Sequence, residues 1–440
     1  MSLINLQRNG SQSPTVHFPP LPAILRTGLI NLFSQSSYPV LVNCWEQEQF
    51  WSGNPDPSRV PIILNIHHPG VFRALIQTRD PLILVEAYLQ GAWDFEGSGE
   101  ALIGLFKDLS QVKLTWRQTL NLGLHSLTLP ELPGLRRVTI AQAATPHTLE
   151  QDQRAIQHHY DVGNDFYRLW LDPLMVYSCA YFPTPETSLE VAQQVKLDII
   201  CRKLQLQPGD FLLDIGCGWG ALLHWANTHY GVQGLGITLS REQYDHNQRW
   251  IGEQGLGDRL QVQLLDYRDL PDAPRFNKIV SVGMIEHVGA KNYPVYFRKV
   301  FNLLKPGGLF LNHGINATTE WRNTSLGERF IDRYIFPHGE LVPLSTTLTA
   351  AEKAGWEIVD VDGWRPHYAL TLRHWAARLE QNQEQAAECL GDRRVQLWRI
   401  YLLGSALGFE TNEMNIYQTL LRRRADQSWN LPITRQHWLC

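Results

Sequence analysis

The chain has 440 residues, a length sufficient for two or three domains with substantial hydrophobic cores. Its net charge of −4 gives no global basis for nucleic-acid binding. Its six cysteines lie apart without CxxC pairs, so neither a disulfide framework nor a metal site is predicted. No apolar run reaches the ~18–20 residues of a transmembrane helix, and without a charged and then apolar leader the expected location is the reducing cytoplasm.

The first part of the chain predicts a flexible end and then a small mixed domain. Residues 1–22 are rich in Ser, Gln and Pro and are expected to be poorly ordered. Within residues 23–109, the runs PVLVNCW and VPIILNI are typical of strands. The run DPLILVEAYLQGAWDF opens with Asp80 and Pro81 and is typical of a helix.

Residues 110–149 predict a linker, because Pro130, Pro133 and Pro146 interrupt any regular pattern there. Residues 112–129 mix apolar and basic side chains. Two interpretations stay open: contact with an anionic membrane, where each basic residue contributes about 1 kcal/mol at most, and a helix packed between domains. A second basic run, Arg422 to Arg424, is more typical of a solvated chain end.

From residue 150 to residue 440, strand and helix patterns alternate as a doubly wound α/β sheet requires. Pro306, Gly307 and Gly308 predict the turn into the last strand. A helical lid is predicted over residues 317–342, closing over the ligands with residues 150–182. Strands are predicted at Phe211–Ile215, Val232–Thr238, Leu260–Asp266, Lys278–Met284 and Gly308–Ile315.

The run FLLDIGCGWG, residues 211–220, predicts a strand, a tight glycine turn and a helix. Glycines let the backbone approach a ligand closely, and the helix N-terminus offers unpaired N–H groups. The absence of a following Lys-Ser/Thr argues against a P-loop. The spelling DxGCGxG differs from GxGxxG, which favours a nucleoside-type ligand such as S-adenosylmethionine over a dinucleotide.

Polar side chains fall at or just past four of the predicted strands: Asp214, Thr238, Asp266 and Glu286. In open α/β sheets ligands bind outside the carboxyl ends of strands, so these groups are expected to face one crevice. The alternative is that Asp214 and Asp266 only cap turns. The second strand ends without the acidic residue that often holds a ribose, so Gln243 is the ribose candidate, and Tyr267 is expected against the adenine.

Several segments occur together in one order and spacing: HHYDVGNDFYRLWLD, VYSCAYF, LLDIGCGWG, GITLSREQ, SVGMIEHVGAKNY and DRYIFPHGELVP. With them the chain resembles cyclopropane-fatty-acyl-phospholipid synthases and mycolic acid cyclopropane synthases over about residues 158–421. The N-terminal region resembles the lipid-proximal extra domain of the phospholipid enzymes. The resemblance implies a class I S-adenosylmethionine-dependent methyltransferase fold, a Rossmann-like seven-stranded sheet with a smaller mixed α/β N-terminal domain.

The resemblance also implies a reaction, in which a methylene group from S-adenosylmethionine is added across a cis double bond of a phospholipid acyl chain. Glycine turn, strand ends and family motifs together predict the donor-binding residues: Tyr177, Ser178, Asp214, Gly216, Gly218, Gly220, Thr238, Leu239, Gln243, Asp266 and Tyr267. Ring closure needs a base, and in the family a bound bicarbonate has that role. The matching positions are Cys179, Glu286, His313, Ile315 through its backbone, and Tyr368.

Each position of the bicarbonate set has a structural alternative. Cys179 suits a buried core position, His313 a core hydrogen bond, and Glu286 a helix cap. Tyr368 is matched mainly through HYxxTL. No nucleophilic cysteine is implied, and Ser405 stands where relatives often carry cysteine.

A carbocation would survive only in a dry pocket with aromatic walls, because aromatic faces stabilise cations by roughly 0.5–2 kcal/mol each. We expect about half of one aromatic set to line this pocket and the rest to be core: Tyr160, Phe166, Tyr167, Trp170, Tyr177, Tyr181, Phe182 and Tyr334.

The implied partners are a phospholipid with an unsaturated acyl chain and the inner face of a membrane, to which the cytoplasmic protein would bind peripherally. No nucleic acid is expected, and the oligomeric state stays open, a homodimer included. Three other functions stay open: a lipid C-methyltransferase that forms a methyl or methylene branch, a methyltransferase for a small amine, and a non-catalytic lipid carrier.

Overall fold

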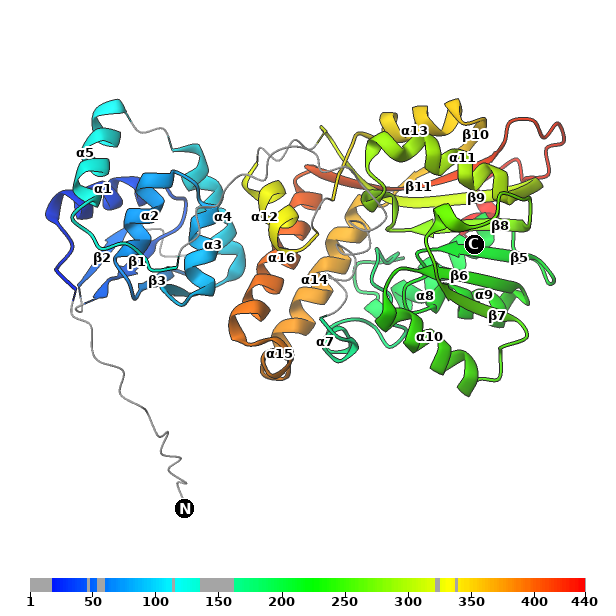
Figure 1. Cartoon of the computed structure of the whole chain (residues 1–440), viewed down its shortest axis with the longest axis horizontal. Helices are drawn as coiled ribbons and strands as arrows, with labels where there is room; N and C mark the ends of the chain where they lie inside the picture. The colour runs from blue at the N-terminus through cyan, green and yellow to red at the C-terminus, as the bar shows by residue number, and fades with distance from the viewer. Residues whose placement is uncertain are drawn as a thin grey trace, which may run out of the picture. The chain divides into compact units, whose positions relative to one another are not determined.

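The computed structural model describes residues 18–45, 48–53, 60–112, 115–134, 162–320, 325–336 and 339–439. The chain divides into two compact units between Ile140 and Ala141 (Figure 1). Most of the segment predicted to be a flexible end and residues 135–149 of the predicted linker lie outside the described residues.

The first unit is built on a four-stranded sheet of order β2-β1-β3-β4. Strands β1 and β3 are parallel and the outer pairs are antiparallel. Both predicted strand runs are present, and the predicted helical run ends at Leu89 and returns as strand β4. The elements are α1 (Ala23–Phe33), β1 (Val40–Asn43), β2 (Gln49–Ser52), β3 (Ile62–Ile66), α2 (Gly70–Thr78), α3 (Leu82–Leu89), β4 (Trp93–Glu96) and α4 (Gly99–Gln111).

Helix α5 (Trp116–Ser126) lies in the segment predicted to be a linker. Thr115 and Gln118 form a capping box at its N-terminus, the Gln118 side chain accepting from Thr115 N at 2.9 Å. Helix α5 packs on α1 and α2, with Leu122 buried against Gly28. This helix belongs to the first unit, which therefore extends beyond residue 109.

The second unit contains a seven-stranded sheet of order β10-β11-β9-β8-β5-β6-β7, which matches the expected Rossmann-like sheet. All neighbours are parallel from β9 to β7, whereas β11 is antiparallel to both β9 and β10. The five predicted strands are present, and β10 and β11 are additional. The strands are β5 (Phe211–Ile215), β6 (Gln233–Thr238), β7 (Leu260–Leu264), β8 (Phe276–Val282), β9 (Leu304–Ala317), β10 (Trp356–Gly363) and β11 (Met414–Arg423).

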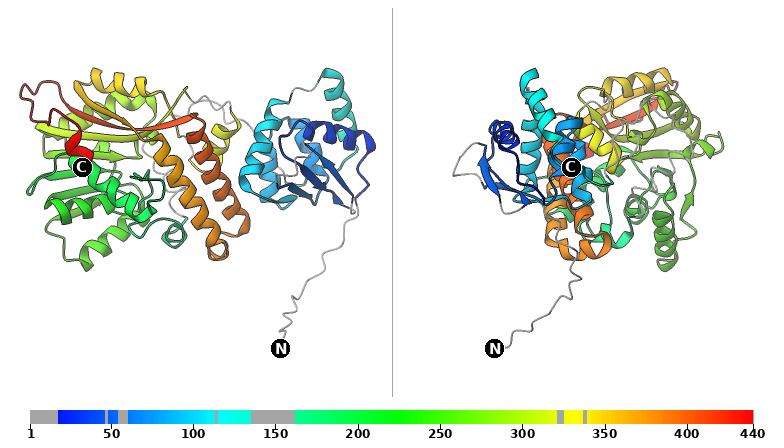
Figure 2. Two further views of the ribbon diagram at one scale, coloured as in Figure 1. Left: turned by 180° about the vertical axis from the view of Figure 1, so that it is seen from behind. Right: turned by 60° about the vertical axis from the view of Figure 1, so that its left-hand side comes forward.

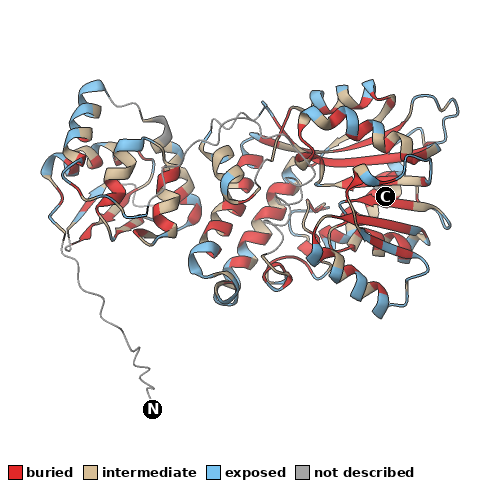
Figure 3. Cartoon of the chain, viewed as in Figure 1, coloured by how far each residue is buried: buried red, intermediate tan, exposed pale blue. Residues whose placement is uncertain are grey.

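Helices cover both faces of this sheet, and the strands between them are largely buried (Figure 3). Successive residues of β5 point to opposite faces: Leu212 packs with α8 and α9, and Leu213 with α11 and α13. One face carries α8 (Leu189–Lys203), α9 (Ala221–Tyr230) and α10 (Arg241–Glu253), and the other carries α11 (Tyr293–Leu303) and α13 (Leu344–Lys353).

A further layer of helices extends the second unit beyond its sheet. Helices α14 (Arg365–Gln381) and α16 (Asp392–Glu410) pack side by side (Figure 2). Their shared core takes in aromatic residues that follow α7 (Asn164–Arg168), Trp170 among them. The remaining helices are α12 (Leu326–Tyr334), α15 (Gln383–Leu390) and α17 (Gln436–Leu439), with single 3₁₀ turns η2 (Tyr267–Asp269), η3 (Ile285–His287) and η4 (Ala290–Asn292).

Two of the three arginines at 422–424, Arg422 and Arg423, pack within the second unit, which corrects the interpretation of a solvated chain end for them. Arg422 is 5% exposed in β11 and pairs with Glu357 across the sheet at 3.1 Å. The Arg423 guanidinium lies 4.4 Å from the centre of the Phe301 ring. In the described part of the chain, no helix combines the length and apolar composition needed to cross a bilayer.

Candidate active site

The turn after β5 has a backbone that glycine adopts far more readily than other residues. Gly216, Gly218 and Gly220 have φ values of 80°, 56° and 86°. The N–H groups of Gly216 and Cys217 both donate to Ile237 O at 3.0 Å, which ties the turn to β6. Helix α9 begins directly after Gly220, so its N-terminus lies at the carboxyl end of β5.

A cavity of about 150 Å³ lies at this edge of the sheet, and we call it the donor cavity. Its lining includes these predicted donor-binding residues: Tyr177, Ser178, Asp214, Gly216, Gly218, Thr238, Leu239, Gln243, Asp266 and Tyr267. Gly220 is not part of that lining. A Cβ at Gly220 would lie 2.0 Å from Asn247 Oδ1, so α10 rather than the cavity requires glycine there.

The polar walls of the donor cavity are partly cross-linked. Thr238 Oγ1 donates to Gln243 Oε1 at 2.7 Å. Asp266 accepts from Arg268 N and Nε, both at 2.8 Å, so it caps η2 and pairs with Arg268 as well as lining the cavity. Asp214 is 3% exposed, and burial raises its pKa to about 7, against a smaller lowering by the Lys196 charge.

A second cavity, which we call the anion cavity, brings together all five residues of the predicted bicarbonate set: Cys179, Glu286, His313, Ile315 and Tyr368. They come from the loop before α8, from η3, from alternate positions of β9 and from α14. The linings of the two cavities share Tyr177, Ser178, Val282, Gly283 and His287. A ligand in one cavity would therefore be a close neighbour of a ligand in the other.

Glu286 is a buried carboxyl group with one engaged and one free oxygen. Ile315 N donates to Glu286 Oε1 at 2.7 Å, so the backbone group expected to face the anion is used by the carboxylate. Glu286 Oε2 has no hydrogen-bond partner among the described residues. Burial raises the pKa of Glu286 to about 7, with a smaller lowering by the Ile315 hydrogen bond.

His313 is 1% exposed and also has one free polar atom. Its Nδ1 lies 3.2 Å from Gln418 Nε2 on the neighbouring strand β11. With the amide donating to Nδ1, the ring proton is on Nε2, which has no partner among the described residues. Burial, with the charges of Lys196 and Lys203, holds the pKa of His313 well below its usual value, so the ring is neutral.

Cys179 is fully buried, and burial raises its pKa above the ordinary thiol range. Its Sγ lies 3.2 Å from Ala180 O and 4.0 Å from Trp364 O. A protonated thiol held in this way is a poor nucleophile, which agrees with the expectation that no nucleophilic cysteine is needed.

The aromatic wall of the anion cavity differs from the predicted one. Of the aromatic set named from the sequence, Tyr177 alone of the described members lines either cavity, so the expectation of about half is wrong. Phe166, Tyr167 and Trp170 are fully buried in the core around α14 and α16, and Tyr160 lies outside the described residues. The wall is built instead by Tyr177, Phe336, Tyr368, Tyr401 and Phe409.

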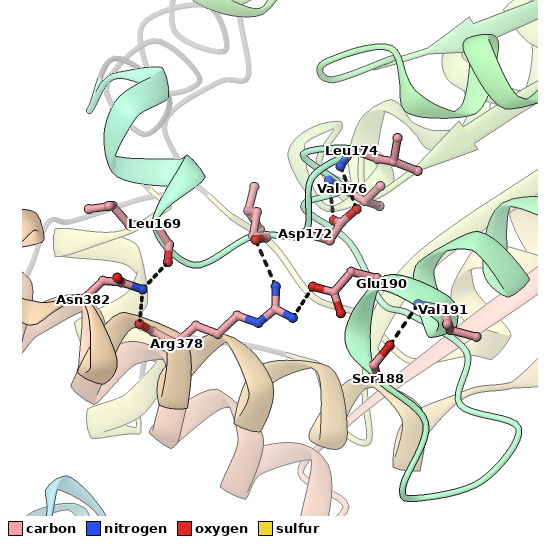
Figure 4. A network of polar contacts seen from close by, with 10 residues as sticks. Leu169, Asp172, Leu174, Val176, Ser188, Glu190, Val191, Arg378 and Asn382 are labelled. Atoms are coloured by element: carbon pink, nitrogen blue, oxygen red, sulfur yellow. Dashed lines mark hydrogen bonds and ion pairs between the residues drawn. The ribbon is translucent and has the colours of Figure 1, made fainter.

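The loop that carries residues 177–179 past both cavities is fastened at its base (Figure 4). Arg378 of α14 donates to Leu171 O at 3.1 Å and pairs with Glu190 of α8. Asp172 accepts from Val176 N at 2.9 Å and so closes the turn. These contacts fix the wall that the two cavities share.

Sequence reasoning missed Lys196 and Gln418. Lys196 is 2% exposed, lines the donor cavity and donates to Ser178 Oγ at 2.9 Å. A lysine among the apolar positions of a helix was a usable signal for it. Gln418 had no such signal, because its strand β11 was not predicted.

Residues 147–419 match the protein family described as mycolic acid cyclopropane synthetase. The chain is 40% identical over 401 residues to a probable fatty acid methyltransferase of Pseudomonas putida, covering 90% of this chain and 95% of that relative. It is 34% identical over 368 residues to the cyclopropane-fatty-acyl-phospholipid synthase of Escherichia coli, covering 82% and 88%. The crystal structure of mycolic acid cyclopropane synthase CmaA1, complexed with SAH and CTAB, superimposes with a TM-score of 0.58 at 33% identity, covering 62% of this chain and 98% of that one.

Proposed function

Because this chain belongs to the mycolic acid cyclopropane synthetase family and is an S-adenosylmethionine-dependent methyltransferase of the cyclopropane synthase type, we propose that it cyclopropanates unsaturated phospholipid acyl chains. The family match and the solved cyclopropane synthase structures confirm the expected class I methyltransferase fold. The hypothesis of a non-catalytic lipid carrier is wrong. The E. coli relative is named for this reaction on phospholipids, which supports the choice of substrate.

S-Adenosylmethionine supplies a methyl group activated by a sulfonium. The residues of the donor cavity fit such a ligand: the glycine turn leaves room for close approach, and polar groups lie at the carboxyl ends of three strands, Asp214, Thr238 and Asp266. The structural relative that binds SAH supports the same donor. Tyr177 and Ser178 separate the donor cavity from the anion cavity, where the double bond would have to lie.

The proposal is carried by two free polar atoms, Glu286 Oε2 and His313 Nε2, in residues that line one cavity. A buried polar atom without a partner costs about 1–3 kcal/mol, so this cavity favours a small ligand that serves both. Bicarbonate fits, because its hydroxyl can donate to Glu286 while its oxygens accept from His313 and from the Tyr368 hydroxyl.

In the proposed reaction the alkene π electrons attack the sulfonium methyl group. The S–CH₃ bond breaks, S-adenosylhomocysteine is the leaving group, and a carbocation remains on the acyl chain. Glu286, His313 and Tyr368 would hold bicarbonate, which would supply the base for the proton that the added methyl group loses as its C–H electron pair closes the ring. The acyl chain gains CH₂ overall and one proton leaves. Glu286 would orient the bicarbonate by accepting a hydrogen bond from the bicarbonate hydroxyl. The apolar lining of the anion cavity, which includes Leu372, Phe409 and Ile416, excludes water that would quench the cation.

Glu286→Gln tests the assignment, since glutamine keeps the shape and the Ile315 contact but cannot accept the bicarbonate proton in the same way. Turnover should fall by roughly 10²-fold or more. The affinity for S-adenosylhomocysteine, measured by calorimetry, should stay unchanged because Glu286 does not line the donor cavity.

The matched control is the wild-type enzyme in buffer depleted of carbon dioxide. Its activity should fall and return when bicarbonate is added. Wild-type turnover in the variant, or no response to bicarbonate, would refute the proposed base.

A lipid C-methyltransferase is the second candidate, favoured by the 40% identity to a probable fatty acid methyltransferase. A cyclopropane and a methylene branch each add CH₂ and have the same mass, so mass spectrometry alone cannot separate them. Proton NMR of the product lipid can, because ring protons resonate far upfield and exocyclic alkene protons downfield. Alkene signals without ring signals would favour the second candidate.

A peripheral membrane contact is part of the proposal, because the substrate is a bilayer lipid. Helix α5 and its C-cap residue support it: four large apolar side chains on their outer side are more than half exposed, while Leu122 on the other side packs on α1. Arg117 lies over the Trp116 ring and adds positive charge beside them. The outer face consists of Trp116, Leu120, Leu124 and Leu127.

A further inference from the structure

We propose that Lys196 and Asp214 recognise the two charges of the amino-acid part of S-adenosylmethionine, Lys196 with Ser178 binding the carboxylate and Asp214 the ammonium group. The inference rests on the donor part of the proposed function and does not depend on which lipid product is formed. Lys196 is a positioning and recognition residue that the family motifs do not name.

Helix α8 places Lys196 against the shared wall of the two cavities. Its ammonium donates to Ser178 Oγ at 2.9 Å and is 2% exposed. One turn earlier, Gln193 donates to Ser178 O at 2.9 Å and to Val176 O at 3.3 Å. The backbone and the hydroxyl of Ser178 are therefore both held by one helix.

The contact from Lys196 also orients the Ser178 hydroxyl. Because Ser178 Oγ accepts from an ammonium, its own O–H points to another acceptor. An ammonium has three N–H donors, and the bond to Ser178 is the single hydrogen bond of Lys196 within the described residues. Lys196 and Ser178 together thus form a set of donors that line the donor cavity and suit a carboxylate.

Asp214 supplies the opposite charge on the same cavity. It is 3% exposed at the end of β5, and among the described residues no ion pair joins it to Lys196 within 4.0 Å. The two charges nevertheless interact, since burial lowers the pKa of Lys196 to about 8 while Asp172, Cys179 and Asp214 raise it. Two buried opposite charges that remain apart are costly, and a zwitterion bound between them would offset that cost.

The other charged groups in the lining are already engaged. Arg268 binds Asp266 through Nε at 2.8 Å and through Nη2 at 2.9 Å. Lys196 is then the cation, and Asp214 the anion, that stay available in the described lining for the charged end of a ligand. The nucleoside end of the donor needs no such pair.

Two ligands test this assignment. S-Adenosylhomocysteine carries the zwitterionic amino-acid part, and 5′-methylthioadenosine has the same nucleoside and sulfur without it. In Lys196→Met, the affinity for S-adenosylhomocysteine should fall roughly 10–100-fold, since a charge-assisted hydrogen bond is lost. The affinity for 5′-methylthioadenosine should not fall. Both are measured by calorimetry on the full chain.

Lys203→Met is the matched control, because Lys203 is a buried lysine of the same helix that hydrogen-bonds Asp362 at 2.6 Å and does not line the donor cavity. It should lower the melting temperature without changing the affinity ratio of the two ligands. Ser178→Ala gives a second variant should Lys196→Met fold poorly, with a smaller loss confined to S-adenosylhomocysteine.

An equal loss for both ligands in Lys196→Met and Ser178→Ala, or no loss in either, overturns the inference. A wild-type protein that binds neither ligand would instead overturn the donor assignment in the proposed function. The two failures are thus separated by the wild-type measurement.

Discussion

The three glycines of the turn after β5 have similar φ values but serve different purposes. A Cβ added at Gly218 would meet nothing within 4 Å, and Gly218 lines the donor cavity, so its small size leaves space for a ligand. A Cβ at Gly220 would overlap the Asn247 side chain, which itself donates to Gly218 O at 2.9 Å. Both positions are glycines of the same motif, so the sequence does not distinguish their purposes. The packing of α10 against Gly220 shows that Gly220 serves stability, whereas Gly218 serves ligand binding.

Gly218→Ala should therefore mainly weaken ligand binding, and Gly220→Ala should mainly lower stability. Alanine in a left-handed conformation costs about 1–2 kcal/mol, the expected loss of stability for Gly218→Ala. Gly220→Ala adds the overlap with Asn247, for a total of about 2–4 kcal/mol. Affinity for S-adenosylhomocysteine should fall more in Gly218→Ala. Thermal unfolding and calorimetry on both variants check this, and the reverse order of either effect would contradict it.

At the scale of elements, strands were predictable where burial on both faces gives a continuous apolar run. Strand β5 reads FLLDI and is followed by the glycine turn. Strand β10 reads WEIVDVDG and β11 ends in arginines, so their charged residues concealed two strands of the same sheet. Missing β11 also hid Gln418, the side chain that lies 3.2 Å from His313 Nδ1. The five-residue anion set came from the family resemblance, because no local pattern links Tyr368 in α14 to Glu286 in η3.

Helix α5 is amphipathic, and its sequence did not distinguish membrane contact from packing between domains. Its outer face gives a prediction. Replacing Leu120 and Leu124 by serine should weaken binding of the full chain to phosphatidylglycerol vesicles about tenfold or more, because each exposed leucine loses apolar burial in the interface. Sedimentation with vesicles measures the effect.

Val295→Ser, which removes a similarly exposed apolar side chain on α11, is the control and should leave vesicle binding unchanged. Equal binding by the α5 double variant and the wild-type protein would exclude this face as the membrane contact.

For the molecule as a whole, the buried ionisable groups of the candidate active site lower the stability of the fold, and the proposed chemistry needs these same groups. The second unit keeps two carboxyl groups, Glu286 and Asp214, in places where burial opposes their ionisation. His313 is held neutral with a free Nε2 in the same region. A core built for stability alone would replace these groups with apolar ones, so their presence marks where the fold serves chemistry.

This exchange predicts how stability depends on pH. Burial raises the pKa of Glu286 from 4.5 to about 7, so the folded protein binds this proton more tightly than the unfolded chain does. The stabilisation is fully present below the unfolded value and is lost as pH rises through about 7, by about 3 kcal/mol. Glu286→Gln removes this loss, so the inactive variant should match the wild-type protein near pH 4.5 and exceed its stability by about 3 kcal/mol at pH 8. Unfolding of the second unit, followed across this range without ligands, measures both curves. Parallel curves would show that Glu286 ionises freely in the folded state, and the carboxyl group would then lack the shared-proton character that its part in ring closure requires.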